Sequence, residues 1–396
     1  MQTKPIQLTE RDLTILELVS RYRLLTTEQI VRAVQGSRMA LRKRLSRLAA
    51  HQYLAPVRKP KPLYYRVGRQ PRIWGLGKRA PQILQAAAAR HTNWHRRNQE
   101  ASSLLVDHTL LAAEVVIRFE NLHSSAVRVI DQAEILAGAP QRTRQARSPL
   151  GWSVSFSHGR ERNISTGVVP DRLFALHFPL LPESRNTQYF LLEADRGTEP
   201  IERASLAQGT SIVRKFLSYG ASLAGGIPQS RFNIPHSPRI LFVTQIPGRL
   251  HNMVEAFKRL NAARPKDKIL PANAFLFAAT ERLNPDWVLS TEWLNGHGEK
   301  VVLARQFTSA RSFLGELDKY CGIEPALRQR DKAVYVATTC SADELSQACS
   351  IMYAQALVRG TLLHLVHNQG SSGDPHKISE QIGMRGFRVT RCSTED

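Results

Sequence analysis

The first 57 residues carry a helical pattern of apolar positions three times over. Apolar residues recur at helical spacing from Leu13, and Thr9 followed three residues later by Asp12 is typical of a helix N-terminus. A short second helix is expected from about Thr26, and a third at residues 38–50. Strand-like stretches at 51–57 and 63–67 then flank a basic turn, so the pattern predicts three helices followed by a hairpin.

The third expected helix has two contrasting faces. Its apolar stripe is Leu41, Leu45 and Leu48, and the opposite face carries Met39, Lys43, Ser46 and Arg47. Three helices and a basic hairpin predict a winged helix-turn-helix whose third helix enters the major groove of DNA. A winged helix that binds protein or forms dimers is the alternative. The candidate DNA-binding residues are Arg38, Arg42, Lys43 and Arg47 on the helix, with Lys59, Lys61 and Arg66 on the hairpin.

Beyond residue 101 the pattern changes to an alternation of strands and helices. Such alternation predicts an α/β fold, with a sheet sandwiched between helices. Residues 138–150, rich in Gly, Pro, Arg and Ser, are expected to form a flexible loop. The expected elements up to residue 219 are a helix at 102–119, strands at 126–136 and 152–156, the two apolar runs described next and a helix at 202–219. Beyond them, strands are expected at 239–244, 274–279, 333–338 and 361–366, and helices at 250–260 and 342–357.

Two apolar runs each bring acidic residues to one end. The first surrounds Pro170-Asp171, and the second, Tyr189 to Leu192, leads into Glu193 and Asp195. Residues two apart on a strand point to the same face, so Glu193 and Asp195 are expected to lie on one face beside Asp171. Carboxylates grouped in this way suit a hard cation such as Mg²⁺. The alternative is a turn, because acids commonly follow strands and Arg196-Gly197-Thr198 favours turns.

The positive charge of the chain is concentrated at its start. Of the net charge of +22, residues 1–100 contribute +16, with 21 Lys and Arg against five acidic residues. This asymmetry is typical of a module that binds a polyanion, and a solvated basic surface without a partner is the alternative. With 396 residues, we expect a winged-helix domain at 1–90, a junction at 91–101, an α/β core at 102–320 and an α/β extension with a disordered tail at 321–396.

Several classes of protein are excluded by the sequence. No stretch of about 20 apolar residues predicts a membrane span, and the first residues do not resemble a signal peptide. The four cysteines form no CxxC pair, which fits the cytoplasm and disfavours a zinc site. Walker, GxGxxG and GxSxG motifs are absent, and His364 and His367 are interpreted as core or surface histidines.

Two groups of motifs resemble the replication-relaxation family of plasmids and integrative elements. They are Leu8-Thr9-Glu10-Arg11-Asp12 with Leu24-Leu25-Thr26-Thr27-Glu28-Gln29-Ile30, and Pro170-Asp171 with Phe190-Leu191-Leu192-Glu193-Ala194-Asp195-Arg196-Gly197-Thr198-Glu199. The resemblance spans residues 8–245. It implies a winged helix fused to a restriction-endonuclease-like core, as in relaxases that mobilise plasmids without the usual histidine triad.

The resemblance also implies a catalytic pattern of Pro-Asp followed by Glu-x-Lys on the next strand. This chain has Asp195 at the position of the lysine, and Lys215 on the following expected helix is a candidate replacement, with a solvated lysine as the alternative. The implied catalytic residues are Asp171, Glu193, Asp195 and Lys215. The three acids, with the carbonyl of Ala194, would hold Mg²⁺ or Mn²⁺.

The sequence therefore predicts a protein that binds double-stranded DNA and nicks or relaxes it at an origin, in plasmid or mobile-element mobilisation or replication. Other proteins of a transfer or replication complex are expected partners, and an oligomer is compatible with the sequence. Two alternatives stay open: a non-enzymatic replication or transcription regulator with an inactive core, and a scaffold in a DNA transfer or transposition complex.

Overall fold

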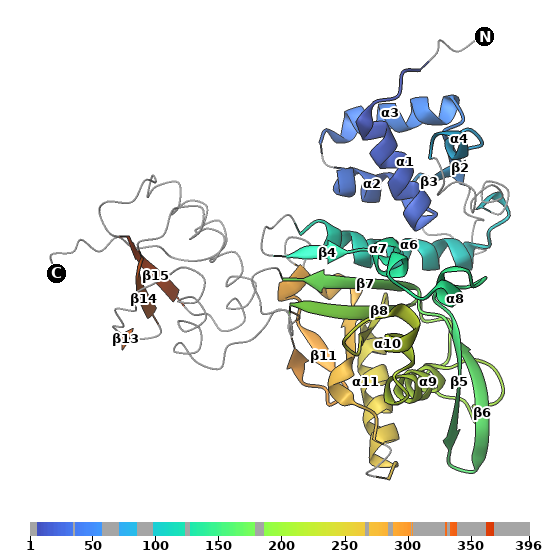
Figure 1. The fold of residues 1–396 in the computed structure, drawn as a ribbon, viewed down its shortest axis with the longest axis vertical. Coiled ribbons are helices and arrows are strands. Elements are labelled where there is room, and N and C mark those ends of the chain that lie inside the picture. Colours follow the sequence, from blue (N-terminus) through green and yellow to red (C-terminus); the bar gives the residue numbers. More distant parts are fainter. Residues whose placement is uncertain are drawn as a thin grey trace. The chain divides into compact units, whose positions relative to one another are not determined.

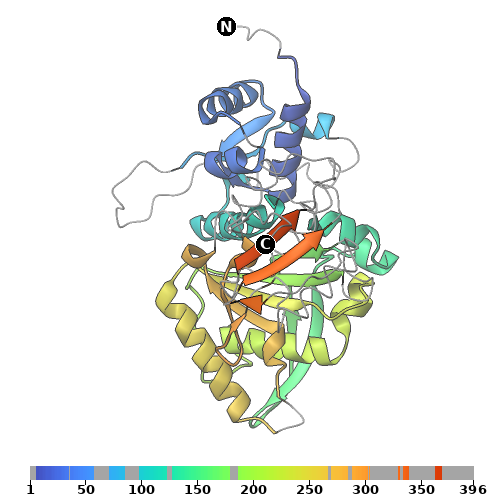
Figure 2. The same cartoon turned by 90° about the vertical axis from the view of Figure 1, so that its left-hand side faces the viewer.

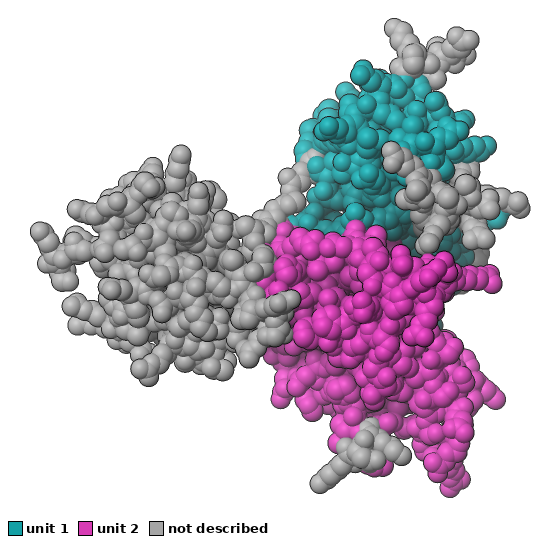
Figure 3. Space-filling view, viewed as in Figure 1, with its two compact units in different colours: residues 1–121, 193–199, 243–246 teal, residues 122–192, 200–242, 247–396 magenta. Residues whose placement is uncertain are grey.

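The computed structural model describes residues 6–34, 36–57, 71–84, 98–122, 127–178, 186–265, 269–283, 288–301 and 303, together with the backbone of three strands near the C-terminus. It divides into two compact units (Figure 3). Unit 1 comprises residues 1–121 with the short segments 193–199 and 243–246. Unit 2 comprises residues 122–192, 200–242 and 247–396.

Unit 1 begins with three helices whose ends follow from local capping. In α1 (Glu10–Tyr22), the Thr9 hydroxyl accepts a bond from the N–H of Asp12 while the Asp12 carboxylate accepts from the N–H of Thr9, which forms a capping box. The helix α2 (Thr27–Val34) follows the two-residue strand β1 (Leu25–Thr26), and Ser37 caps α3 (Arg38–Ala50). All three predicted helices are confirmed.

A small antiparallel sheet completes this part of unit 1. Its strand order is β1-β3-β2, with β2 at Leu54–Val57 and β3 at Ile73–Leu76. The ladder runs from the Leu54–Leu76 pair to the Val57–Ile73 pair. The partner of β2 is thus a stretch later than the predicted return strand at 63–67, which lies outside the described residues. Ile73, Trp74 and Leu76 are buried, which explains why this stretch pairs.

The long helix α6 (Ser103–Glu120) also belongs to unit 1. Val106 is fully buried in an apolar cluster with Leu24, Val57 and Ile73, and Leu110 packs against the same cluster. This division differs from the predicted boundary at residues 91–101. The helix at 102–119 was expected to begin the α/β core, but its apolar side chains pack into the cluster of unit 1. A further helical turn, α4 (Ala80–Ile83), follows β3 in the chain.

A seven-stranded mixed sheet is the centre of the second half of the fold (Figures 1 and 2). Its strand order is β12-β11-β10-β9-β8-β7-β4. The strands are β4 (Arg128–Ile130), β7 (Arg172–His177), β8 (Thr187–Asp195), β9 (Arg239–Thr244), β10 (Phe275–Ala279), β11 (Trp293–Asn295) and β12 (Lys300–Val301). The β4–β7, β7–β8, β10–β11 and β11–β12 pairs are antiparallel. The N–H of Gln245 bonds the carbonyl of Asp195 at 3.2 Å, which places the carboxyl ends of β8 and β9 side by side, so these two strands run parallel.

The helices α9 (Ile212–Ala224), α10 (Ile227–Phe232) and α11 (Pro247–Ala262) belong to unit 2. Phe216 of α9 and Phe257 of α11 pack against Phe242, Phe275 and Phe277 of the sheet in one apolar core. The hairpin of β5 (Trp152–His158) and β6 (Glu161–Val168) forms a separate two-stranded sheet that contacts α9. The predicted α/β class is confirmed.

Three predictions for segments of unit 2 are wrong. The strand expected at 126–136 ends at Ile130, because Asp131 caps the helix α7 (Gln132–Ala137). The helix expected from residue 202 begins at Ile212, where Ser211 is the N-cap. The expected flexible loop at 138–150 contains α8 (Gln141–Arg144), and buried Thr143 donates a hydrogen bond of 2.7 Å to the carbonyl of Arg231.

Three further strands form their own sheet. They are β13 (Gln329–Arg330), β14 (Ala333–Thr338) and β15 (Leu362–His367), and β14 and β15 are parallel. Earlier in the chain lie the 3-10 turns η4 (Ala272–Ala274), η5 (Thr280–Arg282) and η6 (Val288–Ser290). The strands expected at 333–338 and 361–366 are thereby found. The helix expected at 342–357 and the tail lie outside the described residues.

Candidate functional site

The predicted two-faced character of α3 is present in the structure. Leu41, Leu45 and Leu48 are buried, and Met39 on the opposite face is 68% exposed. Lys43 and Arg47 are exposed on that same face and make no hydrogen bond or ion pair within the described part of the chain. Their charges are therefore available to a polyanionic ligand.

Two other predicted DNA-binding residues are held by a carboxylate. Glu28 of α2 accepts hydrogen bonds from Arg38 at 2.6 and 3.1 Å and from Arg42 at 3.0 Å. The hydrogen bond from Arg38, together with that from Arg42, lowers the pKa of Glu28 against the opposing effect of burial, so Glu28 is ionised at neutral pH. All three side chains are at least 40% exposed, so the pairs are open to solvent and to competing anions.

Arg72 is a neighbour of this face that the sequence analysis missed. Its guanidinium lies over the ring of Trp74 at 5.5 Å and donates a hydrogen bond of 3.3 Å to the hydroxyl of Ser46 on α3. Its position directly before the apolar stretch Ile73-Trp74 is the signal that would have placed it beside the hairpin. Lys59, Lys61 and Arg66, also predicted to bind DNA, lie outside the described residues.

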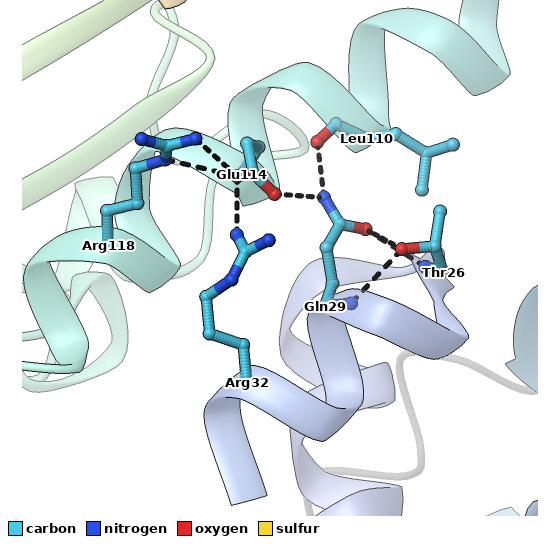
Figure 4. A network of polar contacts seen from close by, with 6 residues as sticks. All are labelled: Thr26, Gln29, Arg32, Leu110, Glu114 and Arg118. Atoms are coloured by element: carbon cyan, nitrogen blue, oxygen red, sulfur yellow. Dashed lines mark hydrogen bonds and ion pairs between the residues drawn. The ribbon is translucent and has the colours of Figure 1, made fainter. Parts of the chain in front are cut away.

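A polar network joins α2 to α6 within unit 1 (Figure 4). The buried Gln29 amide donates to the carbonyl of Leu110 at 2.9 Å and to Glu114 at 3.3 Å, and its oxygen accepts from the N–H of Thr26. Glu114 also pairs with Arg32 of α2 and, at 3.0 Å, with Arg118. Because Gln29 and Arg32 both reach α6, these contacts hold α2 against that helix.

The acidic residues of the expected core flank one antiparallel ladder. The β7–β8 ladder runs from the His177–Thr187 pair to the Arg172–Leu192 pair, and the N–H of Asp171 bonds the carbonyl of Leu192 at 2.9 Å. Asp171 and Glu193 are thus the next residues on the two strands after the last pair. Asp171 is half-buried, and Glu193 is only 4% exposed.

Asp195 connects two strands of the sheet. Asp195 is 7% exposed, its carboxylate accepts a hydrogen bond of 2.8 Å from the hydroxyl of Thr244, and its carbonyl accepts from the N–H of Gln245. Thr244 and Gln245 were not predicted as neighbours of the acidic residues. The signal was available, because Thr244 is the polar end of the apolar strand that follows in the sequence.

The expected convergence of three carboxylates on one metal ion is not found in the described residues. Among them, no group of three or more His, Cys, Asp or Glu side chains is arranged to hold a metal. Asp171 and Glu193, supplemented by the carbonyl of Ala194, are the oxygen donors that a cation would find here. Lys215 lies on α9, half-buried, between buried Val213 and Phe216.

Comparison with known proteins identifies the family. The model of the replication-relaxation family matches residues 16–234, which is more than half of the chain. The chain belongs to the replication-relaxation family. The match begins within α1 and covers α2, α3, α6 and the whole β7–β8 ladder with its acidic residues.

The other comparisons add little to this assignment. No curated protein matches the chain. Among solved structures, the SdaI restriction endonuclease is 13% identical and is matched over 63% of this chain and 82% of its own, with a TM-score of 0.15. A TM-score this low does not establish a common fold. None of the helices in the described residues is long and apolar enough to cross a membrane.

Proposed function

We propose that this member of the replication-relaxation family binds double-stranded DNA through unit 1 and nicks or relaxes it, with the help of Mg²⁺ or Mn²⁺, at an origin used in plasmid or mobile-element mobilisation or replication. The activity belongs to the cytoplasm, with other proteins of a transfer or replication complex as partners. The observation that carries the proposal is the position of Asp171 and Glu193 directly beyond the last pair of the β7–β8 ladder, within the region of the family match.

The DNA-binding part of the proposal is supported by the element order of unit 1. The order α1-β1-α2-α3-β2-β3, with a sheet ordered β1-β3-β2, is that expected of a winged helix-turn-helix. In such a domain α3 enters the major groove, and Lys43 and Arg47 are the exposed cations on its free face. Arg38 and Arg42 would exchange Glu28 for phosphates, because their exposed pairs with Glu28 are weak and guanidinium groups also bind phosphate bidentately.

The cleavage part of the proposal is supported by the chemistry of the donors. Asp171 and Glu193 offer carboxylate oxygens, which are the ligands that Mg²⁺ prefers. Bound there, Mg²⁺ would polarise the scissile phosphate and lower the pKa of an attacking water. Lys215 would neutralise charge that develops on the phosphate, and the hydrogen bonds of Asp195 to Thr244 and Gln245 would hold the end of β8 in place.

A nicking assay tests this proposal. Supercoiled plasmid carrying the origin of the element is incubated with the full chain in Mg²⁺ or in EDTA. We expect nicking only with Mg²⁺, abolished by Asp171→Asn and by Glu193→Gln, with plasmid binding kept in both variants. Glu134→Gln is the matched control, because Glu134 is an exposed acid of unit 2 that pairs with Arg128. Nicking that survives in Glu193→Gln would contradict the assignment of the site.

One observation favours a second candidate, a DNA-binding regulator with an inactive core. Asp195 occupies the position where the family pattern has a lysine, and its carboxylate is used in the bond to Thr244. A chain that binds origin DNA with high affinity but shows no nicking with Mg²⁺ or Mn²⁺ would be this regulator.

A further inference from the structure

Unit 2 contains a cavity that lies apart from the acidic residues of β7 and β8 in the sequence. It has a volume of about 430 Å³ and is lined by the end of the β5–β6 hairpin, by residues 202–206 and by parts of α9 and α11. The hairpin and both helices are labelled in Figure 1. Small-molecule sites in proteins have volumes of about 300–1,000 Å³, so the cavity can hold a ligand of the size of a nucleotide.

Three arginines from three different segments line this cavity: Arg160, Arg203 and Arg259. The Nε of Arg203 donates to the carbonyl of Thr210 at 2.7 Å, which fixes the plane of the guanidinium while leaving its two terminal nitrogens for other acceptors. Arg160, at the turn of the hairpin, makes no hydrogen bond or ion pair within the described residues.

The two acids that line the cavity leave an excess of positive charge, with three arginines against two carboxylates. Glu161 accepts hydrogen bonds of 3.1 Å from the N–H groups of Leu206 and Ala207, so its carboxylate is used to hold that segment. Glu202 pairs with Arg259 at 2.6 Å, and both side chains are more than half exposed. Such an exposed pair contributes little to stability, so an anionic ligand can displace Glu202.

The lining also contains one histidine, His158. Burial lowers the pKa of His158, the charge of Arg264 lowers it further, and Glu161 acts in the opposite direction. The imidazole is therefore neutral at pH 7 and can donate or accept a hydrogen bond with a polar ligand.

The remaining lining is apolar. Leu206, Val213, Ala256 and Leu260 contribute carbon atoms to the cavity wall beside the cationic groups. A ligand that fits has both an anionic group and a flat apolar body. Guanidinium groups bind phosphate bidentately, and a nucleobase covers apolar side chains, so a nucleotide satisfies both halves of the cavity.

We propose that this cavity binds one nucleotide unit, with its phosphate on Arg160, Arg203 and Arg259 and its base against the apolar wall. The nucleotide is part of a single DNA strand or is a free mononucleotide. The choice of a nucleotide as the ligand rests on the proposed function in DNA processing. The cavity and its charges are independent of that function.

Calorimetric titration of the full chain tests the proposal. The probes are deoxyadenosine monophosphate, a short 5′-phosphorylated oligo(dT) and inorganic phosphate. One probe with a base should bind to a single site, and the double variant Arg160→Ala/Arg203→Ala should weaken it about tenfold or more, since each arginine supplies a charge-assisted hydrogen bond. Glu202→Gln should strengthen binding severalfold, because it frees Arg259.

Arg128→Ala is the matched control, since Arg128 is an exposed arginine of the same unit whose partner is Glu134; it should leave binding unchanged. Tight binding of the monophosphate identifies a free nucleotide as the ligand, and binding of oligo(dT) alone identifies a strand. The proposal would be overturned if neither the monophosphate nor oligo(dT) bound, if inorganic phosphate bound as tightly as the probes with a base, or if the double variant bound as tightly as the wild type. Duplex binding, measured in parallel, should be unchanged in the double variant, which separates this site from α3.

Discussion

The basic residues of α3 differ in how they are held. Arg44 is bound to Asp12 of α1, with an Nε–Oδ1 distance of 2.7 Å and a second bond from its terminal nitrogen, whereas the neighbouring Lys43 is exposed and makes no hydrogen bond or ion pair among the described residues. The helical spacing of Leu41, Leu45 and Leu48 was sufficient to predict which face is exposed. It was not sufficient to predict that Glu28 holds Arg38 and Arg42, because that contact depends on how α2 and α3 cross.

Lys43 gives the first prediction. Lys43→Ala should weaken duplex DNA binding and reduce the slope of log K against log salt by about 0.9, the value for one lost phosphate contact. The matched control is Lys78→Ala, since Lys78 is an exposed lysine of unit 1 outside α3. Fluorescence anisotropy over a range of salt concentrations measures the affinity and the salt slope of each variant. Equal slopes for the two variants would remove α3 from the interface.

Asp12 gives a prediction about stability and pH. Burial alone would raise its pKa, but the hydrogen bonds from Arg44 and Thr9 and the charge of Arg44 outweigh burial, so the pKa lies below its ordinary value. A carboxyl whose pKa is lower in the folded state stabilises the fold fully above its unfolded pKa of about 3.9. This stabilisation is lost as the pH falls through the folded pKa.

Asp12→Asn should therefore destabilise unit 1 by about 2–3 kcal/mol at pH 7, because it leaves the partly buried Arg44 without its carboxylate. Denaturant unfolding at pH 7 and below pH 4 measures the effect. The difference between wild type and variant should shrink at the lower pH. A difference that stays constant would show that the Asp12 charge is not what stabilises this contact.

At the scale of elements, helices were easier to predict than the boundary between the two units. The caps at Thr9, Ser37 and Ser102 mark helix starts in the sequence itself. The membership of α6 in unit 1 depends on contacts between distant segments, such as Gln29 with Leu110, which no local pattern carries. For the same reason the late partner of β2 was missed, whereas the capping role of Asp131 rests on a local contact with the N–H of Glu134.

The position of α6 predicts the behaviour of fragments. A fragment that ends at residue 90 lacks Val106, Leu110 and Glu114, so it exposes part of the cluster of Leu24, Val57 and Ile73 and leaves Gln29 without its partners. We expect the fragment 6–122 to be more stable than 6–90, on the order of 3 kcal/mol, from the apolar surface that α6 covers. Urea unfolding of the two fragments measures this, and equal midpoints would contradict it.

At the scale of the whole molecule, charge and fold class were predictable, and the geometry of the acidic residues was only partly so. The excess of positive charge in residues 1–100 coincides with unit 1, and the alternation of helices and strands coincides with the seven-stranded sheet. The sequence pattern predicted that Asp171, Glu193 and Asp195 lie together in one group. The structure binds Asp195 to Thr244 of β9 instead, a contact that depends on which strand lies beside β8.

The central claim is that Asp171 and Glu193 share one divalent cation. Calorimetric titration of the full chain with Mn²⁺, without DNA, tests it most directly, since Mn²⁺ takes the same oxygen ligands as Mg²⁺. The account predicts one site in the wild type, lost in Asp171→Asn and in Glu193→Gln and kept in the control Glu134→Gln. Mn²⁺ binding that is equal in the wild type and both site variants, or a wild type that binds no ion, would contradict it.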